Sequence, residues 1–237
     1  MNELKVFSPE KMQGLNKDWV YSSKKQRMLS YEYRRKISWS IEDIRKCCED
    51  VNSRPNIIFI IAATCWIMDA TEHFISKSDN KKSILSAVRR DVLDCFEYNK
   101  KDIFDRNKQY IKTLRSFVLA HPLDTTDKRH AKYKLDGKYI AVDIAGTCNS
   151  IQYKLMSKSK LGRYAFKHLS PDGMINECTE SDIFICSCST DDECKMTWIG
   201  FSLNDVVNTI NLCTDSLREL DKYLKTIKRQ DFIAHRN

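Results

Sequence analysis

The sequence predicts a mainly α-helical protein: a helical bundle that a small antiparallel β-sheet interrupts before the last helix, so that the fold is α+β overall. Up to about residue 120, apolar residues recur at steps of three and four. Between about residues 130 and 201 they alternate with polar residues, and after residue 202 the helical period returns. We expect four segments: a basic N-terminal segment (1–37), a helical bundle (38–128), a β insertion (129–201) and a C-terminal helix (202–237) that completes the bundle.

Four helices are expected before residue 121. The first begins at Ser40, because Ser40 and Asp43 have the spacing of a capping box with Asp in place of Glu. The run Arg54-Pro55-Asn56 ends it, and Pro122 ends the fourth helix because proline has no backbone N–H. The second helix is apolar on nearly all sides, as in the centre of a bundle. The last three helices are expected over 57–76, 81–98 and 101–120.

A small antiparallel sheet of about four strands is expected in the insertion. The pair Asp136-Gly137 lies between two β-prone runs, which is typical of a hairpin. A second hairpin is expected from strands at Ile183–Ser187 and Met196–Phe201, which flank a polar turn at 190–193.

The C-terminal helix carries the most regular pattern in the chain. Ser202 is the expected N-cap, with Asp205 at the third helical position. An apolar seam follows at alternating steps of three and four, which suits a helix that closes a bundle or one that forms a coiled-coil dimer, and we favour the bundle. The seam consists of Leu203, Val206, Ile210, Cys213, Leu217, Leu220, Leu224 and Ile227.

Composition indicates a folded protein that needs neither disulfides nor a membrane. The chain has 237 residues, of which 42% are apolar, enough for a sizeable core. The most apolar run, Ile57–Met68, is shorter than the ~18 residues of a membrane span, and the first residues carry charge where a signal peptide needs an apolar region. A cytoplasmic location is therefore expected.

No metal or cofactor is expected. The chain has 10 cysteines but no C-x2-C pair, so reduced, buried thiols are expected rather than zinc ligands. Asp69, Glu72 and His73 share one helix face, which we interpret as a polar edge of the bundle.

A net charge of +8 favours polyanionic partners such as RNA. Basic residues concentrate at 24–36, 154–167 and 222–236, although solvated surface also explains such stretches. In the N-terminal segment, in and around the first stretch, aromatic residues are interleaved with the basic ones; they could stack on bases or pack the segment onto the bundle. These aromatic residues are Tyr21, Tyr31, Tyr33 and Trp39.

Two segments at the ends of expected helices are similar to each other. Both have the form Arg-x5-His with an apolar centre and Ala before the His: Arg115 to His121 and Arg229 to His235. A third pair, Arg163 and His168, has four residues between Arg and His; it falls in the insertion without a long helix, and we discount it.

These two segments resemble the Arg-x4-6-His motif of the HEPN superfamily, small helical domains of toxin–antitoxin, phage-defence and RNA-processing systems. The resemblance implies a metal-independent endoribonuclease, a hydrolase of bacterial antiviral defence or stress response, that acts as a homodimer or with a partner protein. It assigns His121 and His235 to acid–base catalysis and Arg115 and Arg229 to the phosphate. Imidazole titrates near neutral pH, and a guanidinium binds phosphate with two hydrogen bonds.

Arg and His six residues apart lie about 120° apart around a helix axis, so two copies of the motif would have to meet around one phosphodiester. Two alternatives remain. The chain could be a non-catalytic interaction or dimerisation protein that uses the 203–227 helix, with structural Arg and His residues. It could also bind RNA or DNA as a regulator without cleaving it, in which case salt-sensitive binding survives the loss of His.

Overall fold

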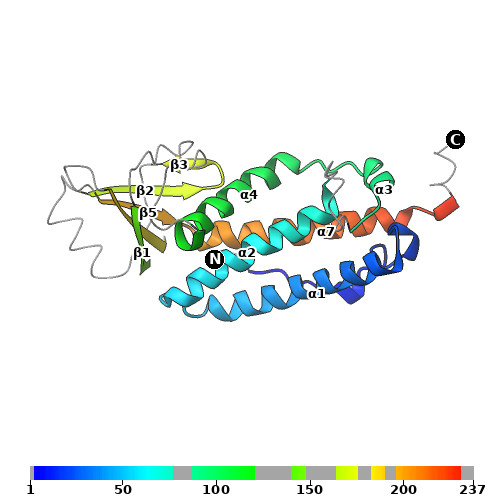
Figure 1. Ribbon diagram of the computed structural model, residues 1–237, viewed down its shortest axis with the longest axis horizontal. Coiled ribbons are helices and arrows are strands. Elements are labelled where there is room, and N and C mark those ends of the chain that lie inside the picture. Colours follow the sequence, from blue (N-terminus) through cyan, green and yellow to red (C-terminus); the bar gives the residue numbers. More distant parts are fainter. Residues whose placement is uncertain are drawn as a thin grey trace. The chain divides into compact units, whose positions relative to one another are not determined.

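The structure is a computed structural model that describes residues 3–76, 87–120, 140–147, 164–175, 183–189 and 196–230 (Figure 1). As predicted, the described part is mainly helical and carries a small sheet. The helices are α1 (Lys24–Cys47), α2 (Arg54–Ile75), α3 (Arg90–Asp94), α4 (Lys101–Arg115) and α7 (Leu203–Thr226), with 3-10 turns η1 (Pro9–Lys11) and η2 (Asp18–Val20) and a π turn η3 (Ser116–Ala120). The strands are β1 (Ile140–Thr147), β2 (Tyr164–Ser170), β3 (Gly173–Ile175), β4 (Ile183–Ser189) and β5 (Met196–Phe201).

The sheet has five strands in the order β1-β4-β5-β2-β3. Both strands expected between residues 183 and 201 are present, and β4 pairs antiparallel with β5. The expected all-antiparallel sheet is not confirmed, because β2 pairs with β5 in parallel, Phe166 opposite Trp198. A tight turn cannot join parallel neighbours; here the chain passes through β3 and β4 between them. The hairpin predicted at Asp136-Gly137 lies outside the described residues.

The prediction that the first helix begins at Ser40 is wrong, because α1 begins at Lys24. The Oγ of Ser23 accepts a hydrogen bond from the Gln26 backbone N–H at 3.2 Å. In return the Gln26 side-chain oxygen accepts one from the Ser22 N–H at 3.0 Å. This reciprocal capping starts the helix 16 residues before Ser40, and the second part of the basic N-terminal segment, from Lys24 on, is therefore helical.

The helix predicted over 81–98 is wrong in the described part, where only the five residues of α3 are helical. Arg89 has an extended backbone, with ψ of 137°, and its N–H donates to the Val20 carbonyl at 2.9 Å. This donor is used in a tertiary contact and not in a helical turn, so the apolar spacing there reflects packing of a short helix. Residues 77–86 lie outside the described part.

The second and fourth predicted helices are present as α2 and α4, with two differences in their bounds. The run at 54–56, predicted to separate the helices, is the first turn of α2, and α4 ends at Arg115, where the π turn η3 follows. Pro55 lies in the first turn of α2, where its missing N–H costs no helical hydrogen bond. Among the described helices only α2 has the length and composition to cross a membrane, a test that core helices of soluble proteins also pass. Because 61% of its apolar window is buried in the protein, α2 is consistent with a core helix of a soluble protein. Cytoplasmic location stays a prediction.

The predicted N-cap and seam of the C-terminal helix are confirmed. The Ser202 Oγ accepts a hydrogen bond from the Asn204 N–H at 3.1 Å, and α7 follows directly. From Leu203 to Leu224 every residue of the seam is buried, while Ile227 lies just beyond the end of the helix. The seam is therefore core of this chain.

The described chain divides into two compact units. Unit 1 comprises Ile44–Cys65 and Asp105–Asn208, and unit 2 comprises Glu3–Asp43, Trp66–Phe104 and Thr209–Asn237. Unit 1 contains the sheet, whose residues Leu169, Ile199 and Phe201 are buried.

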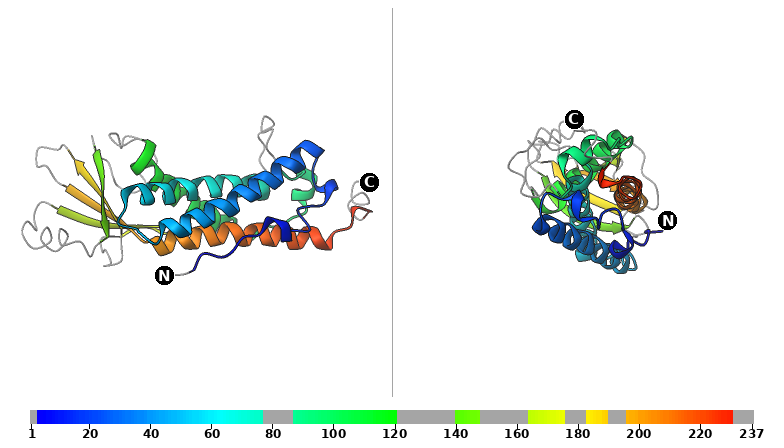
Figure 2. Two further views of the ribbon diagram at one scale, coloured as in Figure 1. Left: turned by 90° about the horizontal axis from the view of Figure 1, so that it is seen from below. Right: turned by 90° about the vertical axis from the view of Figure 1, so that its right-hand side faces the viewer.

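In unit 2 the N-terminal segment, residues 3–21, runs beside α7 (Figure 2, left, dark blue against orange). The Lys5 N–H donates to the Asn211 side chain at 2.9 Å. Further along, the Lys17 ammonium donates to the carbonyls of Leu224 and Ile227 at 2.6 and 3.0 Å, at the C-terminal end of α7. A lysine in this position satisfies carbonyls that the helix leaves without partners.

Gly14 permits the closest approach between this segment and α7. A Cβ added there would lie 2.2 Å from the Asp221 carbonyl oxygen and 2.9 Å from the Leu224 Cβ. We therefore expect Gly14→Ala to lower the free energy of unfolding by about 1–3 kcal/mol, because the backbones would have to separate. Urea unfolding measures the change. The exposed neighbour Gln13 supplies the matched control, Gln13→Ala, and equal stability of both variants would contradict the close packing.

The thiol of Cys213 lies in the buried seam. Burial raises its pKa to about 12, against the opposing effect of a hydrogen bond with Thr71. The fold therefore keeps this thiol protonated, and its contribution to stability is lost as the pH rises from about 9 toward 12.

Because the thiolate is the reactive form, we expect iodoacetamide at pH 8.5 to label the exposed Cys95 of the native protein while Cys213 stays unlabelled until urea unfolds the chain. Peptide mapping by mass spectrometry measures both sites. Equal labelling rates under native conditions would contradict the buried seam.

Candidate functional site

The structure describes only half of the residues in the two Arg-x5-His segments. Arg115 is the last residue of α4 and is exposed, and Arg229 is exposed beyond the end of α7. His121 and His235 lie outside the described residues. Arg115 belongs to unit 1 and Arg229 to unit 2, so the described structure does not test whether the four residues meet, and their catalytic pairing stays a prediction.

Within the described ranges no group of three or more His, Cys, Asp or Glu residues is placed to hold a metal ion. Asp69, Glu72 and His73 are half-buried on α2. Five cysteines whose side chains the structure describes form no disulfide: Cys47, Cys48, Cys65, Cys95 and Cys213.

Basic and aromatic side chains meet along one side of α1. Between residues 24 and 39 the chain has six basic residues and one acidic residue, Glu32. Arg27, Tyr31, Arg35 and Trp39 follow one another at steps of four residues, which places them in one row along the helix. We call this row the α1 stripe.

Within the α1 stripe, Arg35 joins the two aromatic rings. Its guanidinium lies 4.7 Å from the centre of the Trp39 ring and 5.9 Å from that of Tyr31, both within cation–π range. Arg35 also donates to the Glu32 carboxylate at 3.0 Å. Trp39 is nevertheless 51% exposed. Large aromatic side chains are usually well buried, so packing within the described part of the chain does not explain why this ring is exposed.

The other aromatic residues singled out in the sequence serve packing. Tyr33 stacks on Trp66 of α2, with ring centres 6.3 Å apart, and the Lys36 ammonium lies 4.4 Å from the Trp66 ring centre. Tyr21 is buried, and its hydroxyl donates to the Leu15 carbonyl at 2.6 Å while accepting a hydrogen bond from Ser30 at 2.8 Å. Burial raises the pKa of the Tyr21 phenol, which keeps it neutral.

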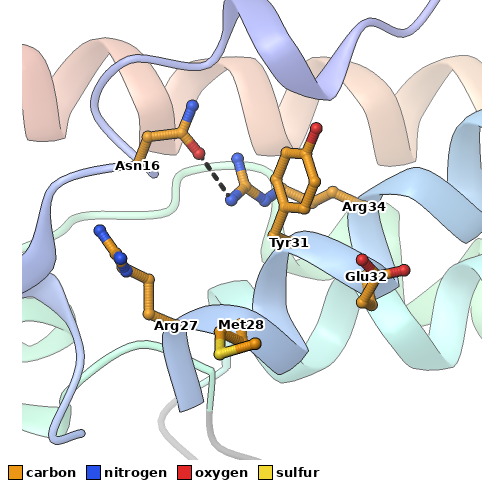
Figure 3. A pocket seen from close by; sticks show the side chains of 6 residues that line it. All are labelled: Asn16, Arg27, Met28, Tyr31, Glu32 and Arg34. Carbon is orange, nitrogen blue, oxygen red and sulfur yellow. Dashed lines mark hydrogen bonds between the residues drawn. The ribbon is translucent and has the colours of Figure 1, made fainter. Parts of the chain in front are cut away.

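A cavity of about 320 Å³ opens beside the first half of the α1 stripe (Figure 3). Its walls come from α1 and from the turn that contains Asn16. Arg34 lies between Asn16 and Tyr31, and its guanidinium carbon is 5.7 Å from the Tyr31 ring centre. The lining residues are Asn16, Arg27, Met28, Tyr31, Glu32 and Arg34.

Arg34 is completely buried. Its Nε donates to the Ser30 carbonyl at 3.3 Å, and its Nη2 donates to the Leu15 carbonyl at 3.3 Å and to the Asn16 side-chain oxygen at 2.9 Å. Its Nη1 is also buried and has no hydrogen-bond partner in the described part of the chain. Burial lowers the pKa of Arg34, and electrostatic interactions with Tyr21 and Asp221 oppose this shift. An arginine nevertheless stays protonated in proteins, so unit 2 holds a buried positive charge.

Comparisons of the chain with protein-family models, with curated proteins and with solved structures gave no match. The resemblance to the HEPN superfamily therefore depends on the two Arg-x5-His segments alone.

The sequence singled out Tyr31 and Trp39 as aromatic residues among basic ones, but not the row that they form with Arg27 and Arg35, and the burial of Arg34 was missed. Ser30, Ile37 and Ile41 lie four residues before Arg34 and three and seven after it, on the same buried helix face. This spacing indicates burial of Arg34 only if the helix is predicted to begin after Ser23. The capping pair of Ser23 and Gln26 gives that start.

Proposed function

We propose that the protein binds single-stranded nucleic acid, RNA in the first place, through the α1 stripe. The observation that carries the proposal is the half-exposed Trp39 ring next to Arg35. Proteins that bind single strands combine a basic surface with aromatic rings on which bases stack. Positive charge attracts phosphates at long range, and exposed rings then hold the bases.

The spacing of the α1 stripe suits this role. Tyr31 and Trp39 are eight residues apart, which is about 12 Å along a helix, and Arg35 lies half-way between them. Two bases stacked on these rings would place the connecting backbone near the Arg35 guanidinium. The Arg35–Glu32 pair is partly exposed, with 38% and 57% of the two side chains accessible. Such a pair contributes little stability, so Arg35 can exchange it for a phosphate.

We expect Trp39→Ala to weaken the binding of a short fluorescent RNA by about tenfold or more, since stacking of a base on an aromatic ring contributes about 1–3 kcal/mol. Arg35→Gln should weaken binding and reduce its dependence on salt by about one phosphate contact. Fluorescence anisotropy over a range of salt concentrations measures both effects.

Two substitutions of exposed residues outside α1 are the controls. Phe59→Ala removes an exposed ring of α2, and Lys222→Gln removes an exposed positive charge of α7. RNA binding that is as strong in Trp39→Ala as in Phe59→Ala would refute the proposal and would favour a protein partner for the Trp39 surface.

Metal-independent RNA cleavage is the second candidate function, and the exposure of Arg115 and Arg229 at helix ends favours it, because phosphate can reach both side chains. We expect purified protein to cleave RNA in excess EDTA, and His121→Ala or His235→Ala to slow cleavage by about 10²-fold or more. RNA binding should survive both substitutions. A wild-type protein that binds RNA without cutting it would leave binding as the function, and the role in defence would lose its support.

A further inference from the structure

We infer that the cavity beside Arg34 binds the phosphomonoester of a nucleotide, either the terminal phosphate of a nucleic-acid strand or a free mononucleotide. The inference extends the proposed function, because Arg27 and Tyr31 belong both to the α1 stripe and to the cavity wall. Binding of a strand end, as opposed to a free mononucleotide, depends on the proposed function. Figure 3 shows the side chains that would surround the phosphate.

The first argument is the missing anion. The hydrogen-bond acceptors of Arg34 are two backbone carbonyls and the Asn16 amide, all of them neutral. Asp221 interacts with Arg34 electrostatically, but its carboxylate oxygens accept hydrogen bonds from the Leu15 N–H and from Lys225. A buried charge without a directly bonded counter-ion is costly. A phosphate in the cavity would place the opposite charge beside the Arg34 guanidinium, because Arg34 belongs to the cavity wall.

The second argument is the set of donors around the cavity. Besides Arg34, the wall has the guanidinium of Arg27 and the amide of Asn16. Arg27 forms an ion pair with Asp18, whose side chain is 81% exposed. An exposed pair of this kind is weak, so Arg27 can turn to a phosphate at little cost. The acidic wall residue, Glu32, already accepts hydrogen bonds from Arg35.

The third argument concerns which kind of phosphate fits. A phosphomonoester carries a charge of about −1.5 to −2 at pH 7 and has three acceptor oxygens, whereas an internal phosphodiester carries one charge and continues as chain on both sides. A cavity that ends at a completely buried Arg34 suits a group attached on one side. Its volume of about 320 Å³ lies at the small end of the range of about 300–1,000 Å³ typical of ligand sites. Tyr31 supplies a ring beside the phosphate for the attached base.

The test compares one short RNA in three forms, with a 5′-phosphate, with a 3′-phosphate and with hydroxyls at both ends, in a buffer without phosphate. We expect one phosphorylated form to bind about tenfold or more tightly than the hydroxyl form. Arg27→Gln should remove this preference. Arg34→Lys, with its folding checked by circular dichroism, should remove it as well. Lys222→Gln is the control and should keep it.

Isothermal titration with a nucleoside 5′-monophosphate and with inorganic phosphate separates the two sources. If the wild type binds the monophosphate and Arg27→Gln does not, the result supports a phosphate site in the cavity. If no RNA binds in the same experiments, only the proposed role of the α1 stripe is refuted. Equal binding of all three RNA forms together with no binding of the monophosphate would overturn the inference while leaving the proposed function intact. Arg35→Gln should weaken the binding of all three RNA forms by the same factor, so that the ratio of their affinities stays the same.

Discussion

A hydrogen bond from the Leu15 backbone N–H to the buried carboxylate of Asp221, 2.9 Å long, holds the N-terminal segment on α7 in unit 2. Its geometry requires Gly14, because the backbones meet too closely there for a side chain. The same turn presents the Leu15 carbonyl and the Asn16 amide to Arg34. Without this contact Arg34 would lose two of its acceptors, and the wall of the cavity that Asn16 forms would be missing.

The buried charge of Arg34 is thus bound into the fold from two sides, α1 and the N-terminal turn. A structural arginine usually reaches a carboxylate with bidentate geometry, but here the nearest buried carboxylate serves a backbone N–H and Lys225 instead. A methionine of similar length would fill the space without the desolvation cost. A charged residue in this place has a physical reason if an anion enters the cavity whose wall Arg34 helps to form.

Periodicity predicted those parts of the fold in which one face of a helix is buried. The seam of α7 and the cap at Ser202 followed from local sequence, as did α2 and α4. Two features did not. The extended backbone of Arg89 results from a contact with Val20, far away in sequence. The parallel pairing of β2 with β5 could not be predicted, because apolar and polar residues alternate in the same way along parallel and antiparallel strands. For the candidate site the sequence singled out Tyr31 and Trp39 among basic residues, but their row with Arg27 and Arg35 and the burial of Arg34 both require the correct start of α1.

Binding and cleavage make separate demands on this chain. The α1 stripe needs only side chains of one helix, residues 27–39, and the rings and cations are already in contact there. Cleavage needs two imidazoles around one phosphodiester, and the two arginines that accompany them belong to different units. A single helix can therefore supply affinity for a strand by itself, whereas catalysis requires an assembly of several segments. Nucleic-acid binding is the simpler function for these residues, and cleavage, where it occurs, would be added to a surface that already holds the strand.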